Sequence, residues 1–98
     1  MNITEKYKVH LDEKDQRFEV QLEDEVAYLD YRWYQDRLML LYIFVPVPFR
    51  GKGVSNVLIE NALSFAREKG AKIQVYCPYI ARYVRTHPQH HDLLEQPS

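Results

Sequence analysis

The stretch Val45-Pro46-Val47-Pro48-Phe49-Arg50-Gly51-Lys52-Gly53-Val54-Ser55 lies where the pattern of this sequence changes. Before it, apolar residues alternate with polar ones or form strand-length runs, and after it they recur at spacings of three and four. Because proline has no amide hydrogen to give to a sheet ladder, Pro46 and Pro48 end the strand before them. The stretch therefore predicts a strand, a basic glycine-containing turn, and then a helix.

Four strands are expected before this junction, in the segments 7–11, 18–22, 26–34 and 38–45. The first two segments alternate apolar with polar residues, which is the period of a half-buried strand. The third is rich in aromatic residues, and the fourth is nearly all apolar, as is typical of a central strand covered on both faces. Short polar turns join the segments, so the pattern predicts an antiparallel β-meander.

A helix, a strand and a second short helix are expected after the junction. One helical face carries the apolar residues Val54, Val57, Leu58, Ala62, Phe65 and Ala66. Gly70 ends that helix, and the segment 72–77 is predicted to be a fifth strand that ends before Pro78. A short helix is expected over 80–85, followed by a polar tail. The resulting order is β-β-β-β-α-β-α, an α+β fold with helices packed on one sheet, in a single domain of residues 1–98.

Composition narrows the class of protein. The chain has 98 residues, a formal net charge of −1 and a pI near 6.4, which argues against a dedicated nucleic-acid binder. Its one cysteine excludes an internal disulfide and fits a reducing compartment. No apolar run is long enough to span a membrane, and residues 1–11 lack the apolar core of a signal peptide. We therefore expect a cytoplasmic protein, a monomer or weak homodimer, with no nucleic-acid or membrane partner.

The glycine turn predicts an anion-binding site. The first amides of a helix have no partner within the helix, and the helix dipole adds positive charge at the same end. Gly51 and Gly53 let the backbone approach a phosphate closely, and Arg50 and Lys52 add positive charge. The spacing of a P-loop is absent, and Asn56 stands where a dinucleotide fingerprint has its third glycine. A different phosphate-bearing ligand is therefore expected.

The segment Arg50-Gly51-Lys52-Gly53-Val54-Ser55 resembles the pattern Arg/Gln-x-x-Gly-x-Gly/Ala of the GNAT acetyltransferases, with a serine in the last position. Further matching segments are Val45-Pro46, Ala62-Leu63-Ser64-Phe65-Ala66-Arg67, Cys77-Pro78-Tyr79 and His87-Pro88. Together they make the chain similar to the compact, single-domain members of that group, over about residues 17–94. The resemblance implies a sheet that is splayed between its fourth and fifth strands.

The resemblance also implies acetyl-CoA as the cofactor, with its pyrophosphate on the glycine turn and its pantetheine arm in the splay. The cofactor-binding residues that it implies are Ile43, Phe44, Val45, Arg50, Gly51, Lys52, Gly53, Val54 and Ser55. Related chains usually carry a histidine and an acidic or polar residue on the fourth strand just before Val-Pro. This chain has Tyr42 and Phe44 there, so it departs from the pattern near the expected reaction centre.

Two residues are the catalytic candidates. Cys77 lies between a predicted strand and a predicted helix, where the resemblance places the acetyl thioester, so its thiol is a candidate for accepting the acetyl group. The alternative for Cys77 is packing as a small apolar residue. Tyr83 is the candidate for protonating the departing CoA thiolate, as a tyrosine does in many related enzymes, and its alternative is aromatic packing. Tyr76 and Tyr79 lie near the same strand end.

Two other clusters are assigned structural roles. His87, His90 and His91 lack an acidic or thiol partner at a conventional metal-ligand spacing, so they are predicted to lie on the surface or in the tail. The aromatic residues of the third strand are predicted to line the core and the pocket, because the chain lacks the basic surface of a base-stacking platform. These residues are Tyr28, Tyr31, Trp33 and Tyr34.

The sequence therefore predicts an acetyl-CoA-dependent N-acetyltransferase whose acceptor is a small-molecule or protein amine. It marks no general base, since nothing distinguishes the candidates Glu23, Glu25 and Asp30. One alternative is a non-catalytic CoA-binding or protein-interaction module of the same fold, which Tyr42 and Phe44 favour because they remove polar groups. A nucleic-acid-binding α/β domain is a third alternative, and the charge balance disfavours it.

Overall fold

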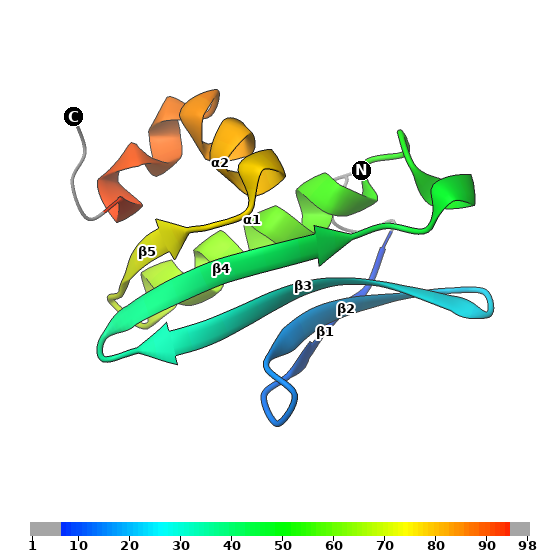
Figure 1. Cartoon of the computed structure of the whole chain (residues 1–98), viewed down its shortest axis with the longest axis horizontal. Helices are drawn as coiled ribbons and strands as arrows, with labels where there is room; N and C mark the ends of the chain where they lie inside the picture. Colours follow the sequence, from blue (N-terminus) through cyan, green and yellow to red (C-terminus); the bar gives the residue numbers. More distant parts are fainter. Residues whose placement is uncertain (1–6, 95–98) are drawn as a thin grey trace.

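The computed structural model describes residues 7–94 and places five strands in one sheet, in the order β1-β2-β3-β4-β5 (Figure 1). The strands are β1 (Val9–Asp12), β2 (Arg17–Leu22), β3 (Glu25–Tyr34), β4 (Arg37–Phe44) and β5 (Lys72–Val75). Strands β1 to β4 pair antiparallel with their neighbours, and β5 pairs parallel with β4. The predicted antiparallel meander is confirmed, and its first strand begins at Val9, two residues later than expected.

The helices of the described chain are η2 (Val47–Phe49), α1 (Val54–Glu68), α2 (Pro78–Arg85) and η3 (Pro88–Leu93). Figure 1 shows α1 running along one face of the sheet, with α2 beside it. Side-chain hydrogen bonds between Ser55 and Tyr79, and from Tyr83 to Glu60, connect the two helices. The expected α+β fold with helices packed on one sheet is confirmed. None of the described helices is both long and apolar enough to cross a bilayer.

The core lies between α1 and the sheet. Because strand side chains alternate between the two faces, every second residue of the inner strands points to α1 and is buried. These residues are Phe18, Val20, Leu22, Ala27, Leu29, Tyr31, Leu38 and Leu40. The facing side of α1 contributes Leu58, Ile59, Ala62, Leu63 and Ala66, all with exposed fractions of 0 %. The helical periodicity in the sequence predicted most of this buried face, but it missed Ile59 and Leu63, and the predicted Phe65 is only half-buried. Burying each large aliphatic side chain stabilises the fold by about 1.5–3 kcal/mol.

A β-bulge between β3 and β4 reverses the faces of the last residues of β4. Leu40 lies opposite Tyr31, but the next pair is Tyr42 with Asp30, so Leu41 has no residue opposite it. After this extra residue, Ile43 pairs with the buried Leu29 and points to α1. Tyr42 and Phe44 consequently lie on the opposite face, which we call the open face because none of the described helices lies over it (Figure 1).

The fifth strand separates from β4 after a short parallel ladder. The ladder runs from Arg37 opposite Lys72 to Leu40 opposite Val75, and the Tyr76 amide then donates to the Leu40 carbonyl at 2.9 Å. Strand β4 continues to Phe44 with no partner in β5. The predicted splay is therefore present. The expected strand 72–77 is too long, because β5 ends at Val75 and Cys77 is the N-cap residue of α2.

The segment predicted as a polar tail contains regular structure in residues 88–94. Residues Pro88–Leu93 form η3, and Leu94 makes a parallel bridge with Ile73 of β5. The Lys72 ammonium donates to the Asp92 carbonyl at 2.6 Å. Buried Leu93 anchors this segment in the core, and the polar residues around it hydrogen-bond to α1 and α2.

Candidate functional site

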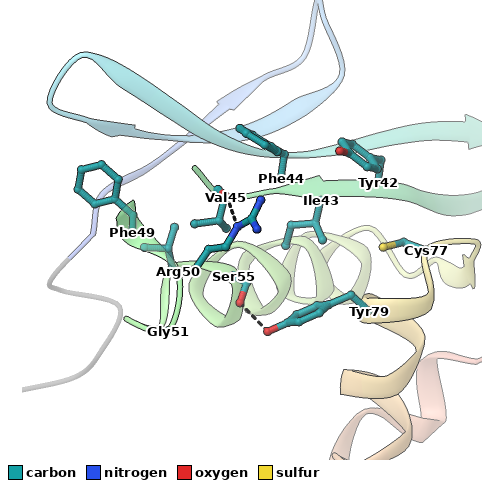
Figure 2. A pocket seen from close by; sticks show the side chains of 11 residues that line it. Tyr42, Ile43, Phe44, Val45, Phe49, Arg50, Gly51, Ser55, Cys77 and Tyr79 are labelled. Atoms are coloured by element: carbon teal, nitrogen blue, oxygen red, sulfur yellow. Dashed lines mark hydrogen bonds between the residues drawn. The ribbon is translucent and has the colours of Figure 1, made fainter. Parts of the chain in front are cut away.

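A pocket of about 410 Å³ opens where β4 ends and the two α-helices begin (Figure 2). Residues from four parts of the chain line it, namely the end of β4, the turn before α1, the first turn of α1 and the first turn of α2. They are Tyr42, Ile43, Phe44, Val45, Phe49, Arg50, Gly51, Val54, Ser55, Cys77 and Tyr79. Its lining is mostly apolar, Arg50 is its only charged residue, and none of these residues is a carboxylate or a histidine.

The glycine turn has the backbone that the sequence predicts. Gly51 and Gly53 adopt φ angles of 77° and 88°, in the left-handed region that glycine tolerates best. Gly53 is the N-cap residue of α1, and no side chain caps the helix there. A Cβ atom added at Gly51 would meet no heavy atom within 4 Å, so space lies open beside the turn. The first amides of α1 therefore face an accessible site without a side-chain acceptor.

Arg50 points away from this turn and along the pocket. Its Nε donates to the Val45 carbonyl at 2.8 Å, and Figure 2 shows the guanidinium beside the end of β4. Lys52 and Gly53, which were predicted as cofactor-binding residues, are not among the residues that line the pocket. The turn thus contributes to the pocket through Arg50 and Gly51, and through Val54 and Ser55 at the start of α1.

The helix α2 closes the other side of the pocket with Cys77 and Tyr79. The Tyr79 and Ser55 hydroxyls lie 2.9 Å apart and connect the first turns of α1 and α2. Cys77 has an exposed fraction of 8 %, and its sulfur points into the space between α2 and β4 in Figure 2. Both interpretations of Cys77 are therefore compatible with its position, because it packs against the core cluster and also lines the pocket.

Tyr83 lies outside the pocket lining, in a polar network between the same two helices. Its hydroxyl donates to the Glu60 carboxylate, and its ring stacks on His87 with centroids 3.8 Å apart. Burial, with the hydrogen bond to Glu60 as the second cause, raises the pKa of Tyr83 well above its ordinary value. Of the tyrosines of α2, it is Tyr79, one helical turn earlier, that lines the pocket, so the catalytic role predicted for Tyr83 stays a prediction that its location does not favour.

The three histidines, which were predicted to lie on the surface or in the tail, lie at the start of the tail segment, where polar contacts hold them. His90 Nε2 lies 3.0 Å from a Glu60 carboxylate oxygen, and His91 Nε2 lies 3.0 Å from the Val84 carbonyl. His87 Nδ1 lies 2.6 Å from the Tyr83 carbonyl. Each is half-buried, because η3 folds back on α1 and α2. The described residues contain no cluster of histidine, cysteine and carboxylate side chains that would hold a metal ion.

The structure thus brings most of the predicted site residues together. Those that line the pocket are Ile43, Phe44, Val45, Arg50, Gly51, Val54, Ser55 and Cys77. Sequence reasoning missed Tyr42, Phe49 and Tyr79 as lining residues. Tyr79 had a local signal, since it follows Cys77-Pro78, but three neighbouring tyrosines gave no means of choosing among them. Of the aromatic residues of β3, only Tyr31 is buried, whereas Trp33 and Tyr34 are exposed and none lines the pocket.

Comparison with known proteins identifies relatives along nearly the whole described chain. Residues 17–93 match the family described as GCN5-related N-acetyl-transferase. The chain is 34 % identical over 83 residues to the protein NATD1 of chicken, covering 82 % of this chain and 76 % of that protein. It is 32 % identical over 84 residues to the human protein NATD1, covering 83 % of this chain and 74 % of that protein. On the strength of this match, the chain belongs to the GCN5-related N-acetyltransferase family.

Proposed function

We propose that this protein binds acetyl-CoA in the pocket and transfers the acetyl group to an amine. The observation that carries the proposal is the continuity of the pocket from the glycine turn, along the unpaired end of β4, to Cys77 and Tyr79. The family supports an acetyltransferase and a CoA ligand in general. The pocket geometry supports the finer proposal for this chain.

The start of α1 suits the pyrophosphate. The uncapped helix N-terminus offers backbone amides and the positive end of the helix dipole. The open space beside Gly51 leaves room for phosphate oxygens near the backbone. Arg50 and Lys52 add positive charge next to the turn, so an anion is favoured there over a neutral group. We assign the pyrophosphate to Gly51, Val54 and Ser55.

The end of β4 suits the pantetheine arm, which carries amide groups. Beyond Leu40, β4 has no β5 partner, so its edge near Ile43 and Val45 faces the pocket with backbone hydrogen-bonding groups. One of them, the Val45 carbonyl, accepts a hydrogen bond from Arg50. An arm bound along this edge would compete with Arg50 for that carbonyl and release the guanidinium towards the anion.

Cys77 and Tyr79 mark the reacting end of the pocket. Bound acetyl-CoA supplies the acetyl thioester, and the acetyl group passes to the amine nitrogen as the bond from the carbonyl carbon to sulfur breaks. We assign the Tyr79 hydroxyl, which Ser55 orients, as the group that gives a proton to the departing sulfur, and the proton that the acetylated nitrogen loses then restores the Tyr79 hydroxyl. In the two-step route, Cys77 Sγ takes the acetyl group while its proton passes to the CoA sulfur, and the amine then takes the acetyl group and returns a proton to Cys77.

The absence of carboxylate and imidazole groups from the pocket lining favours the alternative of a CoA-binding module without catalysis. No lining side chain is an obvious base for deprotonating an ammonium group. An acetyltransferase of this design therefore takes its acceptor from the small neutral fraction of the amine, and its rate should rise with pH in step with that fraction.

A matched pair of glycine variants tests CoA binding. Gly51 and Gly70 have φ angles of 77° and 65°, and an added Cβ meets nothing within 4 Å at either position. Gly51→Ala and Gly70→Ala should therefore each cost about 1 kcal/mol of stability. Only Gly51→Ala should weaken CoA binding, by about tenfold in calorimetry, because only Gly51 lines the pocket. The proposal would be contradicted if the wild type showed no heat of CoA binding, or if both variants lost the same amount of CoA affinity.

The covalent route has a separate test, because Cys77 is the only thiol of the chain. After incubation with acetyl-CoA, intact-protein mass spectrometry should show one added acetyl group that hydroxylamine removes, as expected of a thioester. Cys77→Ala should lack the adduct and keep CoA binding. A wild-type protein that binds CoA and turns over amines without this adduct uses direct attack instead.

A further inference from the structure

The two edge strands of the sheet differ in how their outer sides are covered. On the side of β5 away from β4, Ile73 makes a parallel bridge with Leu94. The described chain adds no strand or bridge to the outer side of β1, which ends the sheet at its other edge (Figure 1). Strand β1 has neither a proline nor a register shift, two features that commonly keep an edge strand from pairing with another chain. Its outer side is therefore available to a further strand.

The ladder shows which backbone groups point outward from β1. The Tyr31 amide donates to the Gln16 carbonyl at 3.0 Å, so the even-numbered residues of β2 direct their backbone groups to β3, and the odd-numbered ones direct theirs to β1. The even-numbered residues of β1 lie opposite these odd-numbered residues and bond to them. The amides and carbonyls of Val9 and Leu11 consequently point away from the sheet.

The side chains of β1 are complementary to a strand of the same sequence. Val9 and Leu11 are half-buried and pack against the core cluster, so they lie on the face that α1 covers. His10 and Asp12 lie on the open face, and the alternation puts Lys8 there as well. An added strand therefore needs apolar residues on one face and, on the other, an acid opposite Lys8 and a base opposite Asp12. A second β1 that runs in the opposite direction meets all of these requirements.

We propose that a second copy of this chain binds at this edge, with the two β1 strands antiparallel and a two-fold axis at His10. Opposite residues of antiparallel strands share a face, so Val9 then lies opposite the partner's Leu11 and exchanges backbone hydrogen bonds with it. On the open face, Lys8 lies opposite the partner's Asp12. Moving the axis by one residue in either direction would separate this pair of opposite charges, so the charges select one register.

The two charged groups of this pair are available for the contact. Lys8 is exposed, and none of the described residues forms an ion pair with it. Arg17 lies opposite Asp12 within the sheet, but its ion pairs are with Glu19 and Asp30. The axis repeats the Lys8–Asp12 contact, so the interface has two such pairs. A contact of one short strand is small, and we expect a weak dimer with a Kd on the order of 10–100 µM.

Sedimentation measurements over a range of concentrations, at about pH 8 where histidine side chains are uncharged, test the dimer. The wild type should shift from 11.8 kDa towards about twice that mass. Val9→Pro removes an outward amide at the first residue of β1, where a proline is compatible with an edge strand, and should raise the Kd at least tenfold. Val9→Ala is the matched control, because it keeps the amide, and it should raise the Kd by about twofold. A wild type that stays monomeric up to about 1 mM, or equal Kd values for the two variants, would overturn the inference.

Charge reversal tests the register. Lys8→Glu and Asp12→Lys should each raise the Kd by about fivefold, and the double variant should return it to within about twofold of the wild type. Lys14→Glu makes the same change of charge in the exposed turn after β1 and should leave the Kd unchanged. Each variant is first checked by urea unfolding, because Asp12 Oδ1 accepts the Asp15 amide at 3.0 Å. A double variant that dimerises no better than the single ones would show that Lys8 and Asp12 do not face each other.

Amide hydrogen exchange locates the interface independently of any substitution. As the protein concentration is raised through the Kd, exchange of the Val9 and Leu11 amides should slow several-fold, since these amides gain partners only in the dimer. The His10 amide, which bonds to β2 in the monomer, should change much less. A dimer in which the Val9 and Leu11 amides exchange as fast as in the monomer would be formed by another surface and would overturn the inference.

Discussion

The helices α1 and α2 contact each other through polar side chains at two places, and the two contacts differ in their chemistry. At their N-terminal ends, the helices are connected by a pair of hydroxyls, Ser55 and Tyr79, beside an open pocket. One turn further along, the Glu60 carboxylate accepts the Tyr83 hydroxyl and lies 3.0 Å from His90. From this difference we infer that the network around Glu60 holds the two helices together, whereas their N-terminal ends, which lack carboxylates, leave space for a ligand.

The network extends to the C-terminal segment. Arg67 of α1 donates to Asp92 of η3 at 2.7 Å, and this hydrogen bond lowers the pKa of the Asp92 carboxyl and raises that of Arg67. His90 lies between the two ends of the network, with Nδ1 3.5 Å from Arg67 Nη2. The side chains of Arg67 and Asp92 are about half exposed, so solvent weakens this outer pair. The stabilising part of the network is therefore the half-buried contact at Glu60.

Among the variants considered, removal of the Glu60 side chain should lower the free energy of unfolding the most. Glu60→Ala leaves the Tyr83 hydroxyl and His90 without their shared acceptor, so urea unfolding should show a loss of about 2 kcal/mol. The control is Glu68→Ala at the exposed end of the same helix, which should change stability by less than about 0.5 kcal/mol. If the two variants lose the same stability, the network does not fasten the helices.

Paired tyrosine variants sharpen the comparison between the two places. Tyr83→Phe should lose about 1 kcal/mol of stability while its acetyl-transfer rate stays within about twofold of the wild type. Tyr79→Phe should behave in the opposite way, with stability nearly unchanged and kcat lower by about tenfold. Both quantities are measured by urea unfolding and steady-state kinetics. A collapse of kcat in Tyr83→Phe alone would restore Tyr83 as the catalytic tyrosine.

The smallest expected effect is the change in the free energy of unfolding with pH that Tyr83 causes. The pKa of Tyr83 is raised above 10.0 by burial and by Glu60, so folding favours its protonated form. The stability that Tyr83 contributes is fully present below pH 10 and is lost as pH rises above that value. The unfolding free energy of the wild type should therefore fall more steeply above pH 10 than that of Tyr83→Phe. Parallel curves for the two proteins would show that Tyr83 ionises as easily in the folded chain as in the unfolded one.

The fold was predictable because its signals are local. Alternation at Phe18, Val20 and Leu22 and the spacing of three and four in α1 each depend on near neighbours in the sequence. The glycine turn was predictable for the same reason, since Gly51 and Gly53 both adopt positive φ angles. The sequence missed η3, because this segment is held by contacts of His90 with Glu60, which lies 30 residues away, and of His91 with the end of α2.

The site was only partly predictable, because its lining depends on which face a side chain occupies. A single extra residue at Leu41 puts Tyr42 and Phe44 on the open face, and nothing in the run from Leu38 to Phe44 marks a bulge. Choosing between Tyr79 and Tyr83 required the position of Glu60 on a separate helix. The periodicity of one segment reveals neither a bulge in a strand nor which residue of another helix lies opposite.

The sequence by itself determined the order of the main strands and helices, most of the buried face of α1, the left-handed backbone of the glycine turn and the family resemblance that the match over residues 17–93 confirmed. These properties arise from local backbone preferences and from the periods of helices and strands. The tertiary structure alone decided that β4 presents aromatic residues to both the pocket and the open face, that Tyr79 rather than Tyr83 lines the pocket, and that the histidines fasten η3. These outcomes depend on strand register and on helix–helix packing, which bring together residues that no local pattern connects.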